Sequence, residues 1–201
     1  MKIITLRHGQ SLWNIEKRVQ GSADIELSDE GVKQAQRAAE YLKGHNIDRV
    51  YSSPLLRAFN TAKIVNQHHG RELVADDALK EINFGDYEGQ KIELIKDFLD
   101  GLRLIDATPP NGEATGDFFA RVHGFMDDVI KKTNEHESLL IVSHFGVVRA
   151  IICYFLGLAP NGRFAFPVEN TAIHMFERKK NEEQFSMVMA NYTGHNKPTS
   201  L

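Results

Sequence analysis

Two segments of the sequence place a histidine directly after an apolar run that is typical of a β-strand. They read Ile3-Ile4-Thr5-Leu6-Arg7-His8-Gly9 and Ile141-Val142-Ser143-His144-Phe145-Gly146. Open α/β sheets bind ligands beyond the carboxyl ends of their parallel strands. If the two strands are neighbours, His8 and His144 face each other across one crevice, where a neutral imidazole could act as a nucleophile. A lone histidine is more often a structural residue, so the hypothesis depends on the matched contexts of the two.

Two arginines are the next candidates, because a guanidinium offers a planar fork of donors that suits two phosphate oxygens. Arg7 adjoins His8. Ser53-Pro54 predicts a helix N-cap followed by proline at the first helical position, which places Arg57 in the first turn, where free N–H groups also favour an anion. Taken alone, an arginine such as Arg57 is more often a surface residue in a solvated ion pair. The loop after the first strand offers two neutral side chains as further hydrogen-bond partners, Asn14 and Gln20.

Hydrolysis of a phosphomonoester also needs a proton for the leaving alkoxide. Three acidic residues lie in the irregular stretch 78–89, namely Glu81, Asp86 and Glu88. Desolvation or the negative charge of a bound phosphate would favour the protonated form that such an acid needs. Glu81 is our candidate, although periodicity alone does not separate it from Asp86 and Glu88.

These residues require a scaffold of alternating strands and helices. Hydrophobic patterning predicts strands at 2–6, 49–52, 72–74, 139–143, 172–177 and 185–190, and helices at 28–43, 54–68, 90–98, 115–133 and 146–156. This alternation is typical of a three-layer α/β/α sandwich with a mostly parallel central sheet. We expect one domain over 1–201, with an irregular or helical insertion at about 90–113 that covers the site.

Composition excludes several classes of protein. The 201 residues carry 24 basic and 27 acidic side chains, a formal net charge of −3, so we expect neither a nucleic acid nor a membrane as partner. Cys153, the single cysteine, cannot form an internal disulfide, and the first residues are too short an apolar run for a signal peptide, so a cytoplasmic location is expected. No ligand set such as His-Glu-x-x-His occurs, so a metal-dependent hydrolase is not expected.

The motifs occur in an order that is similar to a known family. They are Leu6-Arg7-His8-Gly9-Gln10-Ser11, Trp13-Asn14, Gln20-Gly21, Ser52-Ser53-Pro54-Leu55, Arg57-Ala58, Glu81, Phe84-Gly85, Glu88-Gly89, Gly112-Glu113 and Ser143-His144. An Arg-His-Gly triplet alone is weak, but all the motifs in this order are a strong signal. Over nearly its whole length the sequence resembles the histidine phosphatase superfamily, in its phosphoglycerate-mutase-like branch.

The resemblance implies a metal-independent phosphatase without a cofactor. His8 would form a phosphohistidine, and Glu81 would first donate a proton and then, ionised, activate the water that releases phosphate. A hydrogen bond from the other ring nitrogen of His8 to a backbone carbonyl would fix the nucleophilic tautomer. The resemblance places these residues around the phosphoryl group or the substrate: Arg7, Asn14, Gln20, Gly21, Arg57 and His144.

Phe145 departs from the family pattern, in which glycine usually follows the second histidine. In this sequence Gly146 comes one position later. The phenyl ring could line the pocket as an apolar wall for the substrate, or it could shift a backbone N–H away from the phosphate. We therefore include Phe145 among the candidate substrate-binding residues.

Three functions remain after this comparison. The segment 81–89 looks like the phosphatase branch, so we expect hydrolysis of a small phosphorylated metabolite. The alternatives are a phosphoryl transfer of the phosphoglycerate mutase type and a non-catalytic phosphate-binding module, because fold alone does not establish function. The identity of the metabolite and the oligomeric state stay open, a homodimer being one option.

Overall fold

A six-stranded sheet forms the centre of the computed structural model, which describes residues 1–101 and 108–196. The strand order is β3-β2-β4-β1-β5-β6. The strands are Lys2–Arg7 (β1), Arg49–Ser52 (β2), Leu73–Ala75 (β3), Ser138–Ser143 (β4), Ile173–Glu177 (β5) and Ser186–Tyr192 (β6). β1, β2, β3 and β4 pair in parallel, whereas β5 and β6 are antiparallel to their neighbours. The expected mostly parallel sheet is confirmed, and β1 lies in its interior.

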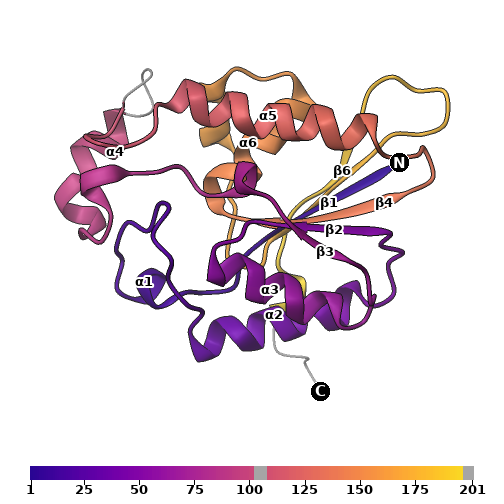
Figure 1. Ribbon diagram of the computed structural model, residues 1–201, viewed down its shortest axis with the longest axis horizontal. Coiled ribbons are helices and arrows are strands. Elements are labelled where there is room, and N and C mark those ends of the chain that lie inside the picture. Colours follow the sequence, from indigo (N-terminus) through magenta and orange to yellow (C-terminus); the bar gives the residue numbers. More distant parts are fainter. Residues whose placement is uncertain (102–107, 197–201) are drawn as a thin grey trace.

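Helices cover both faces of the sheet (Figure 1). Asp29–Leu42 (α2) and Leu56–Asn66 (α3) pack on one face, and Thr115–Lys131 (α5) and Phe145–Leu156 (α6) pack on the other. The shorter helices are Leu12–Ile15 (α1), Lys96–Gly101 (α4) and the 3-10 turns Asp77–Leu79, Gly85–Tyr87, Ile92–Ile95, Pro160–Ala165 and Gly194–Asn196. The chain therefore forms the three-layer α/β/α sandwich that its pattern predicts.

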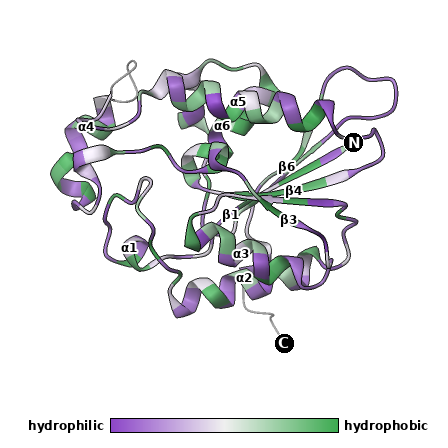
Figure 2. Cartoon of the chain, in the orientation of Figure 1, coloured by the Kyte–Doolittle hydropathy of each residue, from purple (hydrophilic) through white to green (hydrophobic). Residues whose placement is uncertain are grey.

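The hydropathy of each element explains this layering (Figure 2). All six residues of β4 are buried, as expected for a strand that is covered on both faces. In α2 the side chain of Ser28 accepts the N–H of Gly31, and small residues then form one buried stripe on the helix. The buried stripe consists of Gly31, Ala35, Ala38, Ala39 and Leu42. Small side chains here let α2 approach the loop that follows β1.

The start of α3 differs from the prediction. The helix begins at Leu56 and not at Pro54, and its N-terminal N–H is accepted by the Asp24 side chain at 2.6 Å. The hydroxyl of Ser53 lies 2.8 Å from His144 Nε2 and accepts the N–H of Leu55, so it serves the site and does not cap the helix. Arg57 nevertheless lies in the first turn of α3, as expected.

Two further segments differ from their predicted structure. Asn14 lies in α1 and not in a loop, because its side chain and that of Ser11 cap this four-residue helix reciprocally. The predicted helix at 90–98 is instead a 3-10 turn at Ile92–Ile95 followed by α4 at Lys96–Gly101. Part of the predicted insertion at 90–113, residues 102–107, lies outside the described residues.

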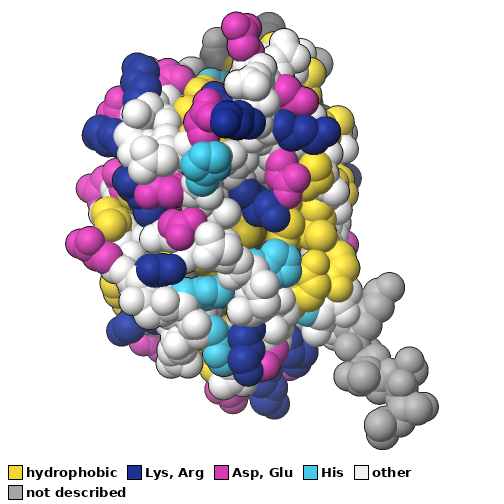
Figure 3. All heavy atoms as spheres, turned by 90° about the vertical axis from the view of Figure 1, so that its right-hand side faces the viewer, with side chains coloured by type: hydrophobic (Ala, Val, Ile, Leu, Met, Phe, Trp, Pro, Cys, Tyr) yellow, Lys and Arg dark blue, Asp and Glu magenta, His cyan; other side chains and the backbone are white. Residues whose placement is uncertain are grey.

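The end of the molecule that carries the N-terminus has a surface of mixed charge. Figure 3 shows basic and acidic side chains interspersed over this face, which agrees with the nearly balanced composition. Among the helices of the described residues, none combines the length and the apolar character needed to cross a membrane.

Candidate active site

The two predicted histidines meet at the carboxyl ends of neighbouring strands. β1 and β4 are parallel neighbours with Arg7 opposite Ser143, and the N–H of His8 donates to the carbonyl of Ser143 at 2.9 Å. The ring centroids of His8 and His144 are 5.2 Å apart. The condition on which the sequence argument depended, that the two strands are adjacent, is therefore met.

A single hydrogen bond fixes the tautomer of His8. Its Nδ1 lies 2.7 Å from the carbonyl oxygen of Gly9, which can only accept, so Nδ1 carries the proton and Nε2 presents a lone pair. Burial, with Arg57 and Arg7 nearby, holds the pKa of His8 well below its usual value. The imidazole is therefore neutral near pH 7. Gly9 must be glycine for this approach, because a Cβ would lie 2.3 Å from the carbonyl oxygen of Gly31 in α2.

Arg57 is buried and anchored by all three nitrogens of its guanidinium. Nε lies 3.2 Å from Nδ1 of His144, and the two Nη atoms donate to the carbonyls of Gly21 and Ala23 at 2.7 Å. Burial lowers the pKa of Arg57 to about 10, with Glu81 acting in the opposite direction, so the group stays charged at neutral pH. The guanidinium thus ties the 20–24 loop to the second histidine.

His144 lies behind this arginine. Because the guanidinium can only donate, Nδ1 of His144 accepts from Arg57, and Nε2 carries the proton that reaches Ser53 Oγ at 2.8 Å. Its side chain is fully buried, and burial together with Arg57 holds its pKa well below the usual value. A cleft lies in front of His8, and His144 is not among the residues that line it. The structure places this residue where it orients Arg57.

Arg7 is held on one side and unpartnered on the other. Nη1 donates to the carbonyl of Val168 at 2.7 Å, whereas buried Nε has no hydrogen-bond partner among residues 1–101 and 108–196. Burial lowers the pKa of Arg7 to about 10, so it is a cation at neutral pH. Buried donors without a partner are uncommon in folded proteins.

A cleft of about 310 Å³ opens in front of His8. Its lining includes most of the predicted phosphate-binding residues, namely Arg7, Asn14, Gln20, Gly21 and Arg57, together with Glu81 and Phe145. Gly21 has a positive φ of 53°, and a Cβ there would lie 2.1 Å from Glu88 Oε1. Only glycine therefore fits this turn, which brings backbone close to the anion site. Nothing in the described parts of the chain gathers three His, Cys, Asp or Glu side chains as metal ligands.

Tertiary contacts separate the three acidic candidates. Glu88 Oε1 accepts the N–H groups of Ser22 and Phe84 at 2.7 and 3.1 Å, so this carboxylate holds two loops together. Asp86 is exposed and accepts from Asn111. Glu81 alone of the three lines the cleft, as the choice of acid requires.

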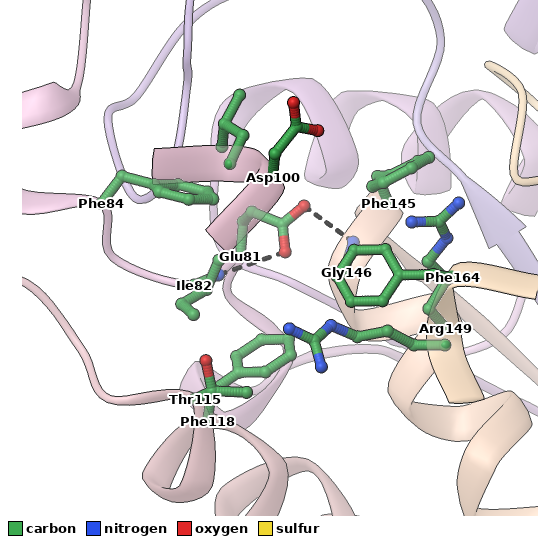
Figure 4. A pocket seen from close by; sticks show the side chains of 12 residues that line it. Glu81, Ile82, Phe84, Asp100, Thr115, Phe118, Phe145, Gly146, Arg149 and Phe164 are labelled. Carbon is green, nitrogen blue, oxygen red and sulfur yellow. Dashed lines mark hydrogen bonds between the residues drawn. The ribbon is translucent and has the colours of Figure 1, made fainter. Parts of the chain in front are cut away.

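Glu81 is positioned by the N-terminus of α6. Its Oε2 accepts the N–H of Gly146 at 2.9 Å and its Oε1 accepts the N–H of Ile82 at 3.1 Å, as Figure 4 shows. The N–H that follows Phe145 therefore binds the carboxylate of the acid. The Phe145 ring lines the cleft, as one of the two hypotheses for this residue expects.

Sequence reasoning missed two residues near the phosphoryl site. Arg149 places its guanidinium carbon 3.9 Å from the centroid of the Phe145 ring, and its charge acts on Arg7. The Nδ2 of Asn170 donates to the carbonyl of His8 at 3.1 Å. Arg149 could have been found from the spacing of four residues after Phe145, which places both on one side of a helix. Asn170 follows no periodic pattern and carries no such signal.

Comparison with known proteins identifies the family. The sequence model described as the histidine phosphatase superfamily (branch 1) matches residues 3–191. Phosphoserine phosphatase 1 of Hydrogenobacter thermophilus is 32% identical to this chain over 188 residues, which are 89% of each chain. Phosphoglycerate mutase-like protein 4 of Arabidopsis thaliana is 35% identical over 87% of this chain and 78% of its own. The solved structure of a phosphoserine phosphatase from Entamoeba histolytica, in complex with phosphoserine, superposes with a TM-score of 0.81 at 30% identity over 96% of this chain and 98% of its own. The chain belongs to the histidine phosphatase superfamily.

Proposed function

We propose that this protein hydrolyses a small phosphomonoester through a phosphohistidine on His8. The observation that carries the proposal is the 2.7 Å hydrogen bond from Nδ1 to the carbonyl of Gly9, which leaves Nε2 as a neutral nucleophile between cations. The relatives named as phosphoserine phosphatases, in sequence and in structure, support hydrolysis as the reaction.

In the first step, Nε2 of His8 attacks phosphorus while the bond to the ester oxygen breaks. Arg7 and Arg57 meet the negative charge of the phosphoryl oxygens, so catalysis is mostly positioning and electrostatic stabilisation. The carboxyl proton of Glu81 passes to the leaving oxygen, which departs as a neutral alcohol. His144 acts as a positioning residue in this scheme, because it holds Arg57 through Nδ1.

In the second step, water attacks the phosphorus of phosphohistidine and the P–N bond breaks. Glu81, now ionised, accepts the proton of the water, and inorganic phosphate leaves with Arg7 and Arg57 still around it. His8 returns to its starting tautomer because the carbonyl of Gly9 still accepts from Nδ1. The scheme balances without a further reactant, and the proposed substrate is a small phosphorylated metabolite.

A panel of phosphorylated metabolites tests this function with the wild type, His8→Ala and Glu81→Gln. We expect phosphate release by the wild type, no release and no acid-labile phosphoenzyme with His8→Ala, and slow turnover with Glu81→Gln. His136→Ala is the matched control, because His136 is exposed and lies outside the cleft. Phosphate release by His8→Ala at the wild-type rate would refute the assignment of His8 as the nucleophile. Rapid interconversion of phosphoglycerates with negligible phosphate release would favour the mutase alternative.

A further inference from the structure

A second cavity of about 350 Å³ lies next to the phosphoryl cleft, on the far side of Glu81. The two cavities share four lining residues, which are Glu81, Phe84, Leu99 and Phe145. A group that leaves the phosphorus and takes a proton from Glu81 therefore stands at the entrance of this second cavity. The arrangement makes the cavity the natural place for the organic part of the substrate.

Aromatic rings dominate the walls of this cavity (Figure 4). Four phenylalanines line it, Phe84, Phe118, Phe145 and Phe164, together with the aliphatic side chains of Ile82 and Leu99. Phe118 and Ile82 belong to the buried core, so the wall that they form is held rigidly. Rigid aromatic walls bind flat apolar groups by burial of area and by ring stacking.

Thr115, at the start of α5, is the one residue of the lining that carries a hydroxyl, and it is 3% exposed. Its Oγ1 is buried away from the cavity surface, so a group in the cavity does not reach this oxygen. The wall is therefore apolar on the side of α5.

The charges around the cavity balance. Arg149 and Arg163 line it together with Glu81 and Asp100, two cations against two acids. Both guanidiniums lie over aromatic rings, that of Arg149 at 3.9 Å from the centroid of Phe145 and that of Arg163 at 4.3 Å from the centroid of Phe164. Such a lining also complements a zwitterion, so the choice of occupant rests on the aromatic walls and not on these charges.

We propose that this cavity is the leaving-group subsite, and that it takes an apolar, ring-sized alcohol. The proposal rests on the proposed phosphatase function and narrows its substrate to phosphate esters of aromatic or alicyclic alcohols. The volume is in the range of small-molecule pockets, and a side chain as small as that of phosphoserine would leave most of it unfilled.

Phenethyl phosphate and ethyl phosphate test the subsite, because both leave as primary alkoxides of similar basicity. A difference in kcat/KM between them therefore measures binding of the ring and not reactivity of the ester. We expect the wild type to favour phenethyl phosphate by at least about tenfold, from the apolar area that the ring buries. O-phosphoserine, which has no ring, should resemble ethyl phosphate.

One variant of the cavity wall and one matched control sharpen the test. Phe164→Ala should reduce the preference for phenethyl phosphate by at least about fivefold, with little change in kcat/KM for ethyl phosphate. Phe59→Ala is its matched control, because Phe59 is a half-buried ring of α3 that does not line the cavity.

The outcomes separate failure of the subsite from failure of the function. If the protein hydrolyses ethyl phosphate and phosphoserine, but kcat/KM for phenethyl phosphate is less than twofold higher than for ethyl phosphate, the subsite is refuted and the phosphatase function is not. Failure to hydrolyse these esters and every metabolite of the panel refutes the phosphatase. In that case calorimetric binding of phenethylphosphonate against ethylphosphonate decides the subsite, and equal affinity for the two refutes it.

Discussion

Gly146→Ala should reduce catalysis without weakening the fold. Gly146 is the second residue of α6, and its N–H holds Glu81 Oε2 at 2.9 Å. A Cβ at this position would lie 2.4 Å from Glu81 Oε1. The atom that it meets is the end of a side chain and not backbone, so the carboxylate moves and α6 stays in place.

The size of the effect follows from this distance. Ordinary contact of a Cβ with a neighbour begins at 3.4 Å, so the Glu81 oxygen must retreat by about 1 Å. A displacement of this size costs about a hundredfold in rate when it affects a reacting group. We therefore expect kcat/KM for ethyl phosphate, which reports the first step alone, to fall about a hundredfold. The kcat/KM for para-nitrophenyl phosphate, whose leaving group needs no proton, should fall less than about threefold.

Thermal unfolding separates this effect from loss of structure. Alanine is favoured over glycine inside a helix by about 0.5–1 kcal/mol, so the variant should unfold at an equal or higher temperature. Gly124→Ala is the matched control, because Gly124 lies within α5 and an added Cβ meets nothing within 4 Å. A wild-type kcat/KM for ethyl phosphate in Gly146→Ala would refute the position that we assign to the acid.

Four further predictions follow from the site. Arg57→Lys keeps the charge but loses the fork of donors, so urea unfolding should show a loss of about 2–4 kcal/mol and kcat/KM should fall at least about tenfold. Burial lowers the pKa of His174 to about 4. As the pH falls through 6.5, His174 therefore becomes protonated in the unfolded chain but stays neutral in the folded chain. The free energy of unfolding should therefore decrease between pH 6.5 and 4, by about 1.4 kcal/mol per pH unit for this group, and His174→Gln should reduce that slope in urea titrations. Gly21→Ala should lower the melting temperature and weaken phosphate binding in calorimetry, because its Cβ would lie 2.1 Å from Glu88 Oε1. Dialysis against a chelator should leave phosphate release unchanged, and a loss that zinc restores would contradict the metal-free scheme.

The sequence was sufficient to predict the fold and the meeting of the two histidines. Each histidine follows an apolar run and is itself followed by a glycine within two residues. In the structure the two runs are the parallel strands β1 and β4, with Arg7 opposite Ser143. A strand that is buried on both faces consists of consecutive apolar residues, so an apolar run in the sequence is enough to locate it. The family resemblance is confirmed by the match over residues 3–191.

Predictions failed where a distant partner replaced a local one. Ser53-Pro54 has the local sequence of a helix start, yet the Ser53 hydroxyl pairs with His144 and Asp24 accepts the first N–H of α3. No window of sequence contains both members of these pairs. The choice among acids has the same cause, since only the tertiary contacts of Glu88 show that its carboxylate holds two loops together.

Burial leaves the histidine nucleophile neutral but both arginines of the site charged. Histidine begins near neutrality, so desolvation beside Arg57 keeps His8 unprotonated and nucleophilic. The same desolvation lowers the pKa of Arg7 and Arg57 only to about 10, which leaves both charged. All positive charge around the nucleophile therefore resides on groups that do not give up their protons at neutral pH. A lysine in place of either arginine has a lower pKa in water, so equal burial would bring it closer to losing its charge. This difference explains why the site uses guanidinium groups to bind an anion next to a neutral imidazole.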